Sequence, residues 1–221
     1  ILLSAKDSEF VFGKPKKFDL PEKPSIAVLP FENMSGDPNF EHVCDAITEE
    51  IIAGLANIPL LFVITRNSSN IYKGRHIKIK QVGQELGVQH VLEGSIQKSG
   101  DRIRVTAQLI DSTKDRHLWA ERYDGILTDL FDFQDEITLK ILSALQIKLE
   151  HGHKSNIWVG ATKDLTALQK YLQAHEMFFK KGDIFAARIL FEEAHKIDPN
   201  FLLPYVYLGW LHMFDAWLGL S

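Results

Sequence analysis

The sequence predicts an α+β domain with a mixed sheet and, after it, an all-α helical segment. Three β-rich runs within residues 90–124 follow one another with short turns between them, as in an antiparallel meander. Apolar residues at helical spacing flank this region on both sides, so helices are available to cover one face of the sheet. After residue 165 the pattern changes to one of paired helices.

The middle run of the meander has the clearest pattern. Apolar and polar residues alternate over residues 102–109, which is the period of a strand with one buried and one wet face. The apolar members are Ile103, Val105, Ala107 and Leu109. Gly100 lies between the first two runs and can take a positive φ in a hairpin turn. Three such strands with one apolar face need a covering layer of helices.

Strands and helices alternate before the meander. Residues 25–31 and 60–65 are short apolar runs, typical of buried strands. Residues 40–58 carry apolar residues at helical spacing, and residues 79–86 form a shorter helix that ends at a glycine. A helix beginning after the N-cap Thr128 follows the meander. The predicted order is therefore β-α-β-α-β-β-β-α.

Composition divides the chain into four parts. Residues 1–24 are polar and rich in proline, as in an extended tether. Residues 25–150 form the α+β domain, and residues 151–164 have the Gly, His, Ser and Asn content of a linker. Residues 165–221 form the helical segment.

The helical segment has the spacing of a tetratricopeptide repeat. Tyr171 and Tyr205 stand 34 positions apart, which is the length of that repeat. The segment would hold one full repeat and the first helix of a second. This last helix is apolar almost all the way round, which is typical of a buried helix. We expect its uncovered side, with Trp210, Phe214 and Trp217, to bind a protein partner, in particular a second copy of the chain. Alternatively, this side packs on the α+β domain of the same chain.

Several runs resemble the TolB-amino-domain-like module. The matching runs are residues 24–31, 62–69, 82–88, 91–95, 104–111 and 117–124. The module occurs in bacterial multidomain regulators, often behind an adenylate or guanylate cyclase domain and ahead of tetratricopeptide repeats. The resemblance implies a bacterial signalling protein whose cyclase domain would lie outside this chain.

Composition and charge argue against several classes of function. The 221 residues are 45% hydrophobic and 24% charged, as in an ordinary globular protein. A net charge of −4 argues against a nucleic-acid partner. No run is long and apolar enough to span a bilayer, and the single cysteine, Cys44, cannot form an internal disulfide. We expect a cytoplasmic location, or a periplasmic one if a membrane helix precedes Ile1.

Motifs for catalysis and cofactor binding are absent from the sequence. It contains no phosphate-binding glycine loop and no nucleophile elbow, so we expect no cofactor and no catalysis from this chain. His42 and Cys44 point to different faces of one helix, so packing explains them better than a metal ion. His151 and His153 lack third and fourth ligands nearby. We predict no metal site.

One set of loop residues could bind a phosphorylated or otherwise anionic small molecule. The loops after the first two strands should leave the same edge of the sheet if those strands are parallel neighbours, and ligands favour that edge. The candidate residues are Asn33, Ser35, Gly36, Arg66, Asn67 and Ser68. The guanidinium of Arg66 suits a phosphate or carboxylate. Alternatively, Arg66 pairs with Glu32 or Asp37, while Asn67 and Ser68 cap a turn.

Two further groups are interpreted as structural. Asp45, Glu49 and Glu50 are predicted to form a solvated acidic face of their helix. Trp119 and Tyr123 are predicted to be core or interface aromatics. The sequence thus predicts a non-catalytic regulatory or protein-interaction region of a larger signalling protein, and the alternative is a small-molecule sensor domain.

Overall fold

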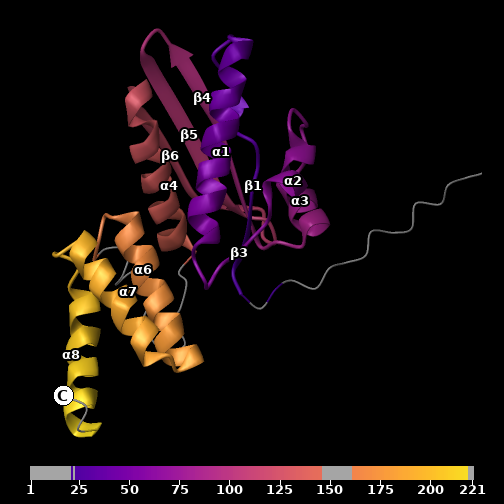
Figure 1. The fold of residues 1–221 in the computed structure, drawn as a ribbon. Coiled ribbons are helices and arrows are strands. Elements are labelled where there is room, and N and C mark those ends of the chain that lie inside the picture. Colours follow the sequence, from indigo (N-terminus) through magenta and orange to yellow (C-terminus); the bar gives the residue numbers. More distant parts are fainter. Residues whose placement is uncertain (1–20, 22, 146–160, 219–221) are drawn as a thin grey trace, which may run out of the picture.

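The computed structural model describes residues 21, 23–145 and 161–218, and Figure 1 shows how they are arranged. A mixed sheet lies behind long helices, and the helices of the second part of the chain pack beneath this layer. Most of the predicted tether and residues 151–160 of the predicted linker lie outside the described residues. The α+β architecture predicted from the sequence is therefore confirmed for the first part of the chain.

The sheet combines a parallel half with an antiparallel half. Its strands are β1 (Ser25–Val28), β2 (Glu32–Asn33), β3 (Phe62–Val63), β4 (His90–Ser99), β5 (Arg102–Asp111) and β6 (Arg116–Ile126). The strand order is β3-β1-β4-β5-β6, and β2 pairs with β4 beyond β1. β1 runs parallel to β3 and β4, whereas β4, β5 and β6 are antiparallel. The predicted meander is therefore confirmed.

The two short strands before the meander differ from the prediction. β1 ends at Val28 because Pro30, two residues later, has no N–H to donate to a neighbouring strand. The chain then returns to the sheet as β2, which the sequence did not predict. β3 has two residues, since the chain turns at Thr65 into the short helix α2 (Arg66–Ser69).

Helices cover one face of the sheet fully and the other face partly. α1 (Glu41–Ala56) and α4 (Leu130–Ala144) lie across one face and enclose the main core. α3 (Ile79–Leu86) and the 3-10 turn η2 (Asn70–Tyr72) cover a smaller cluster on the other face. Two more 3-10 turns, η1 (Pro38–Phe40) and η3 (Leu127–Asp129), lead into α1 and α4. The second face is thus left open along the meander.

Gly94 on β4 shows how tightly the main core is filled. A Cβ at this position would lie 2.4 Å from the ring of Phe31 and 2.5 Å from the carbonyl oxygen of Thr106. Phe31 is 1% exposed, so its ring occupies the space that a larger residue at position 94 would need. A glycine is favourable inside β4 because the absence of a side chain at this position leaves room for the Phe31 ring.

The second part of the chain consists of three helices, α6, α7 and α8. They are α6 (Leu165–Glu176), α7 (Ile184–Ile197) and α8 (Leu202–Leu218), with the π-helical turn η4 (Met177–Lys181) after α6. Asp164 and Asp183 cap α6 and α7 by accepting backbone N–H groups at 2.9 and 3.0 Å. The small residues Ala187 and Ala194 are fully buried, so α6 and α7 pack closely. The assignment of these helices to a tetratricopeptide repeat stays a prediction.

The helical segment shares a core with the α+β domain. The side chain of Gln169 on α6 donates to the carbonyl oxygen of Gly54 on α1 at 3.0 Å. Leu165 and Leu168 belong to the same buried cluster as the residues under α1 and α4. The α+β part and the helical segment therefore share one buried cluster, and the domain boundaries stay a prediction.

Candidate functional site

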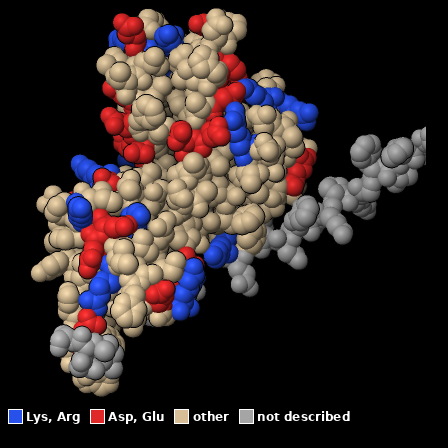
Figure 2. Space-filling model, viewed as in Figure 1, with Lys and Arg blue, Asp and Glu red and all other residues tan. Residues whose placement is uncertain are grey.

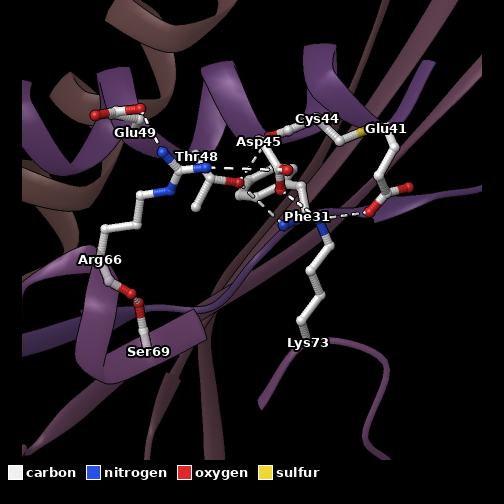
Figure 3. A network of polar contacts seen from close by, with 9 residues as sticks. All are labelled: Phe31, Glu41, Cys44, Asp45, Thr48, Glu49, Arg66, Ser69 and Lys73. Atoms are coloured by element: carbon white, nitrogen blue, oxygen red, sulfur yellow. Dashed lines mark hydrogen bonds and ion pairs between the residues drawn. The ribbon is translucent and has the colours of Figure 1, made fainter. Parts of the chain in front are cut away.

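A row of carboxylates on α1 faces two cations from the segment that follows β3 (Figure 3). Glu41, Asp45 and Glu49 are four residues apart, so they lie on one face of the helix. Arg66 Nη1 lies 2.6 Å from Glu49 Oε2, and Arg66 Nη2 lies 3.9 Å from Asp45 Oδ2. Lys73 Nζ lies 2.5 Å from Asp45 Oδ1 and 2.8 Å from Glu41 Oε1. Five side chains thus form one ion-pair network.

This network fastens α2 and η2 to α1. Burial alone would lower the pKa of Lys73, but hydrogen bonds and charge from Asp45 and Glu41 outweigh it and hold the pKa above its ordinary value. Arg66 pairs with α1 carboxylates and not with Glu32 or Asp37, so the partners named in the sequence analysis were wrong. Glu49 and Glu50 are exposed, and Figure 2 shows Asp and Glu side chains on the surface in the region where α1 and α4 lie in Figure 1. The predicted acidic face is therefore solvated, but Asp45 and Glu49 are also paired with cations.

The first half of the predicted ligand set forms a turn that satisfies its own polar groups. Asn33 Oδ1 accepts the backbone N–H of Ser35 at 3.0 Å and also accepts the Ser35 hydroxyl. Asn33 Nδ2 donates to the carbonyl oxygen of Asp37 at 2.8 Å. Gly36 takes the left-handed conformation with φ 74°, which a glycine adopts without strain. These bonds define a local Asx turn.

The second half of the predicted set lies at another level of the sheet. Ile26 on β1 pairs with Val63 on β3 and with His90 on β4. Asn33 on β2 pairs with Ile96, which lies farther along β4. Arg66, Asn67 and Ser68 follow β3 in α2, and Arg66 pairs with the carboxylates of α1 and not with the Asn33 turn.

The described residues offer no metal centre and no activated thiol. No group of three or more His, Cys, Asp or Glu side chains in ranges 23–145 and 161–218 could hold a metal ion. Burial, followed by the charges of Glu41 and Asp45, raises the pKa of Cys44 to about 12, so the thiol is protonated. His151 and His153 lie outside the described residues.

The aromatic residues of β6 belong to the core. Tyr123 is buried and its ring lies 5.5 Å from that of Phe133 on α4. Trp119 packs against the same cluster, and its indole N–H donates to Glu121 Oε2 at 3.0 Å. The interpretation of both residues as core aromatics is confirmed.

α8 presents a row of exposed apolar side chains, which we call the α8 stripe. Its members are Leu202, Tyr205, Val206, Trp210, Met213, Phe214 and Trp217. Their spacing of three and four residues places them on one side of the helix. Trp210 is 53% exposed and Trp217 is 82% exposed. The stripe includes all three residues that the sequence predicted for partner binding.

The opposite side of α8 is buried against α7. Leu208 and Leu211 lie in the core, and the ring of Tyr207 stacks on Phe191 at 5.0 Å. The carboxylate of α8, Asp215, pairs with Arg188 on α7. The stripe itself therefore carries no ionised carboxylate, lysine or arginine. Sequence reasoning missed Leu202, Tyr205, Val206 and Met213, because a helix that is apolar almost all round does not show which side is covered.

No helix in the described ranges has both the length and the apolar character needed to cross a bilayer.

A family model matches the whole α+β part of the chain. The family is described as "HilA/YgeH-like transcriptional regulator, second domain", and the match covers residues 22–157. A protein of Rhizobium meliloti (strain 1021) named "Putative adenylate cyclase 3" is 43% identical to this chain over 198 residues. That match covers 89% of this chain and 34% of the relative, so the chain spans about a third of the relative's length.

Two solved structures are similar to parts of the chain. TolB from Acinetobacter baumannii has a TM-score of 0.43 at 22% identity, covering 57% of this chain and 29% of that protein. The LpoB C-terminal domain from Salmonella enterica has a TM-score of 0.39 at 16% identity, covering 47% of this chain and 83% of that domain. Scores of this size carry no conclusion about function.

Proposed function

We propose that this chain, which belongs to the family of the HilA/YgeH-like transcriptional regulator second domain, is a non-catalytic regulatory region. It would bind a protein through the α8 stripe. The adenylate cyclase name of the Rhizobium meliloti relative supports a place beside an adenylate or guanylate cyclase domain in a longer signalling protein. The α1 carboxylates and Cys44 have structural roles, which also supports an accessory task.

The exposed stripe on α8 is the observation that carries this proposal. Single exposed apolar residues are common on proteins, but a contiguous apolar patch marks an interaction site. Covering about 300 Å² of such surface would contribute about 7 kcal/mol on an area scale, before the costs of association. Because the stripe has no charged side chain, a partner that covers it removes no charged group of the stripe from water.

We assign the partner as a second copy of the chain, because the stripe complements itself. A two-fold axis through the middle of α8 would place two antiparallel copies of the helix face to face. The facing pairs would be Leu202 with Trp217, Tyr205 with Phe214, Val206 with Met213 and Gly209 with Trp210. A Cβ at Gly209 would meet nothing within 4 Å, so the backbone there is open to an indole ring. The bulkiest side chain at the centre would thus face the smallest residue.

Light scattering across a concentration series tests this proposal. The wild-type chain should shift from monomer to dimer between nanomolar and tens of micromolar concentration, whereas Trp210→Glu should stay monomeric because a carboxylate would be buried at the centre of the contact. Phe131→Glu is the matched control, since Phe131 is 70% exposed on α4 and outside the stripe. The proposal fails if the wild type stays monomeric throughout, or if both variants dimerise as the wild type does.

A further inference from the structure

A hollow opens on the face of the sheet that α1 and α4 leave uncovered. Its volume is about 250 Å³, and it lies between strands β2, β4 and β5 and the loop of residues 73–77 that follows η2. The small core under α3 and η2 ends at Val91, so this face of the meander continues beyond it without a covering helix. The hollow is separate from the α8 stripe and from the ion pairs of α1.

Strand alternation brings polar side chains to the floor of the hollow. Leu92 and Ile96 on β4 point into the main core, so Glu93 between them points to the other face. Gln108 faces Glu93 on β5, and its amide Nε2 donates to Glu93 Oε1. This hydrogen bond occupies one carboxylate oxygen, and a carboxylate can accept further hydrogen bonds through the other. Thr106 adds a hydroxyl to the same floor.

Two carboxylates share the hollow without an ion pair among the described residues. Burial raises the pKa of the Glu93 carboxyl, and the charge of Glu32 acts in the same direction, against the Gln108 hydrogen bond and the charge of His117. Within the described ranges, neither Glu93 nor Glu32 has a Lys, Arg or His nitrogen within 4.0 Å. A partly buried carboxylate left in this state is costly unless a ligand cation neutralises it.

The loop supplies the opposite charge. Arg75 and His76 line the hollow from the loop after η2. Within the same ranges, Arg75 has no carboxylate within 4.0 Å, and its guanidinium has five N–H donors. The hollow therefore has negative groups on its strands and a positive group on its loop.

We propose that this hollow binds a small zwitterion of the amino-acid class, with its ammonium group at Glu93 and Glu32 and its carboxylate at Arg75. A simple cation would leave the guanidinium unpaired, and a simple anion would be repelled by two carboxylates. A zwitterion pairs with both walls through charge-assisted hydrogen bonds. The volume of about 250 Å³ fits a single small molecule and not a nucleotide. The inference goes beyond the proposed function and does not depend on dimerisation.

A thermal-shift screen followed by titration calorimetry tests the inference. The probes are free amino acids, each with its N-acetyl and methyl-ester derivative. At least one free amino acid should raise the melting temperature while both of its derivatives do not, because ligand binding to the folded state stabilises it. Glu93→Gln and Arg75→Met should each weaken that binding about tenfold or more. Glu50→Gln, an exposed carboxylate on α1, should leave it unchanged.

Three outcomes would overturn the inference. They are a screen in which no free amino acid raises the melting temperature, a blocked derivative that binds as tightly as its free form, and unchanged affinity in both Glu93→Gln and Arg75→Met. Glu32→Gln serves as a second variant if Glu93→Gln fails to fold, because Glu32 is an exposed residue and its replacement disturbs no buried contact.

Discussion

α1 and α8 are helices of nearly equal length, sixteen and seventeen residues, but they are covered in opposite ways. The apolar residues Ile51 and Leu55 of α1 are fully buried, and its acidic side is paired with Arg66 and Lys73. α8 buries one side against α7 and leaves the α8 stripe exposed. The charged side of α1 is therefore structural, whereas the exposed side of α8 is uncharged and has no partner among the described residues.

The largest difference between the two helices should appear in core truncations. Ile51→Ala should lower the free energy of unfolding by about 2–5 kcal/mol, because Ile51 is 0% exposed and its loss leaves a cavity. Met213→Ala on α8, where the side chain is 66% exposed, should change it by about 0.5 kcal/mol or less. Urea unfolding at concentrations below dimerisation measures both. Equal losses in the two variants would contradict the assigned coverage.

Alanine in place of a glycine should have opposite effects in the covered core and on α8. Gly94→Ala should destabilise the chain by about 1–3 kcal/mol, because the new methyl group would collide with Phe31 and with backbone under α1. Gly209→Ala on α8 should stabilise the monomer by about 0.5–1 kcal/mol, since alanine favours the helix and meets open space there. Thermal unfolding of the monomers gives both signs. A stabilising Gly94→Ala would show that the covered face has room.

The smallest effect concerns the ion pairs of α1 and depends on pH. The pKa of Lys73 is raised above its ordinary value of 10.5, so its contribution to stability is complete below that pH and is lost as pH rises through the folded-state value. Lys73→Met should therefore lower the melting temperature at neutral pH and low salt, and the difference from wild type should vanish in strong alkali. A difference that is constant with pH and salt would assign the loss to packing and not to charge.

Local patterns predicted the parts of the fold that depend on neighbouring residues. The alternation from Arg102 to Gln108 is sufficient to define β5, and Gly87 ends α3 in the left-handed conformation. Pro30 indicates the end of a strand, but no residue near it predicts that the chain returns to pair with β4. Contacts between distant residues, such as that of Arg66 with Glu49, depend on how α2 packs on α1. The spacing of residues in the sequence does not predict that packing.

The candidate sites could likewise be predicted from the sequence only in part. Trp210, Phe214 and Trp217 were predicted because they are large and apolar, whereas the direction of the stripe depends on which side α7 covers. The hollow was missed entirely, since it requires the register that sets Gln108 opposite Glu93 and the loop that carries Arg75 above them. Neither the pairing of Gln108 with Glu93 nor the position of the loop with Arg75 has a local signal in the sequence.

Fluorescence quenching of Trp210 and Trp217 tests whether the α8 stripe is exposed in the monomer and covered by a second copy in the dimer. The chain would carry Phe in place of Trp119 and Trp158, so that only the two tryptophans of the stripe report. The quenching constant for acrylamide should be high at nanomolar concentration, because Trp217 is 82% exposed, and should fall several-fold as the dimer forms. A quenching constant that is the same at every concentration would show that no second copy covers the stripe.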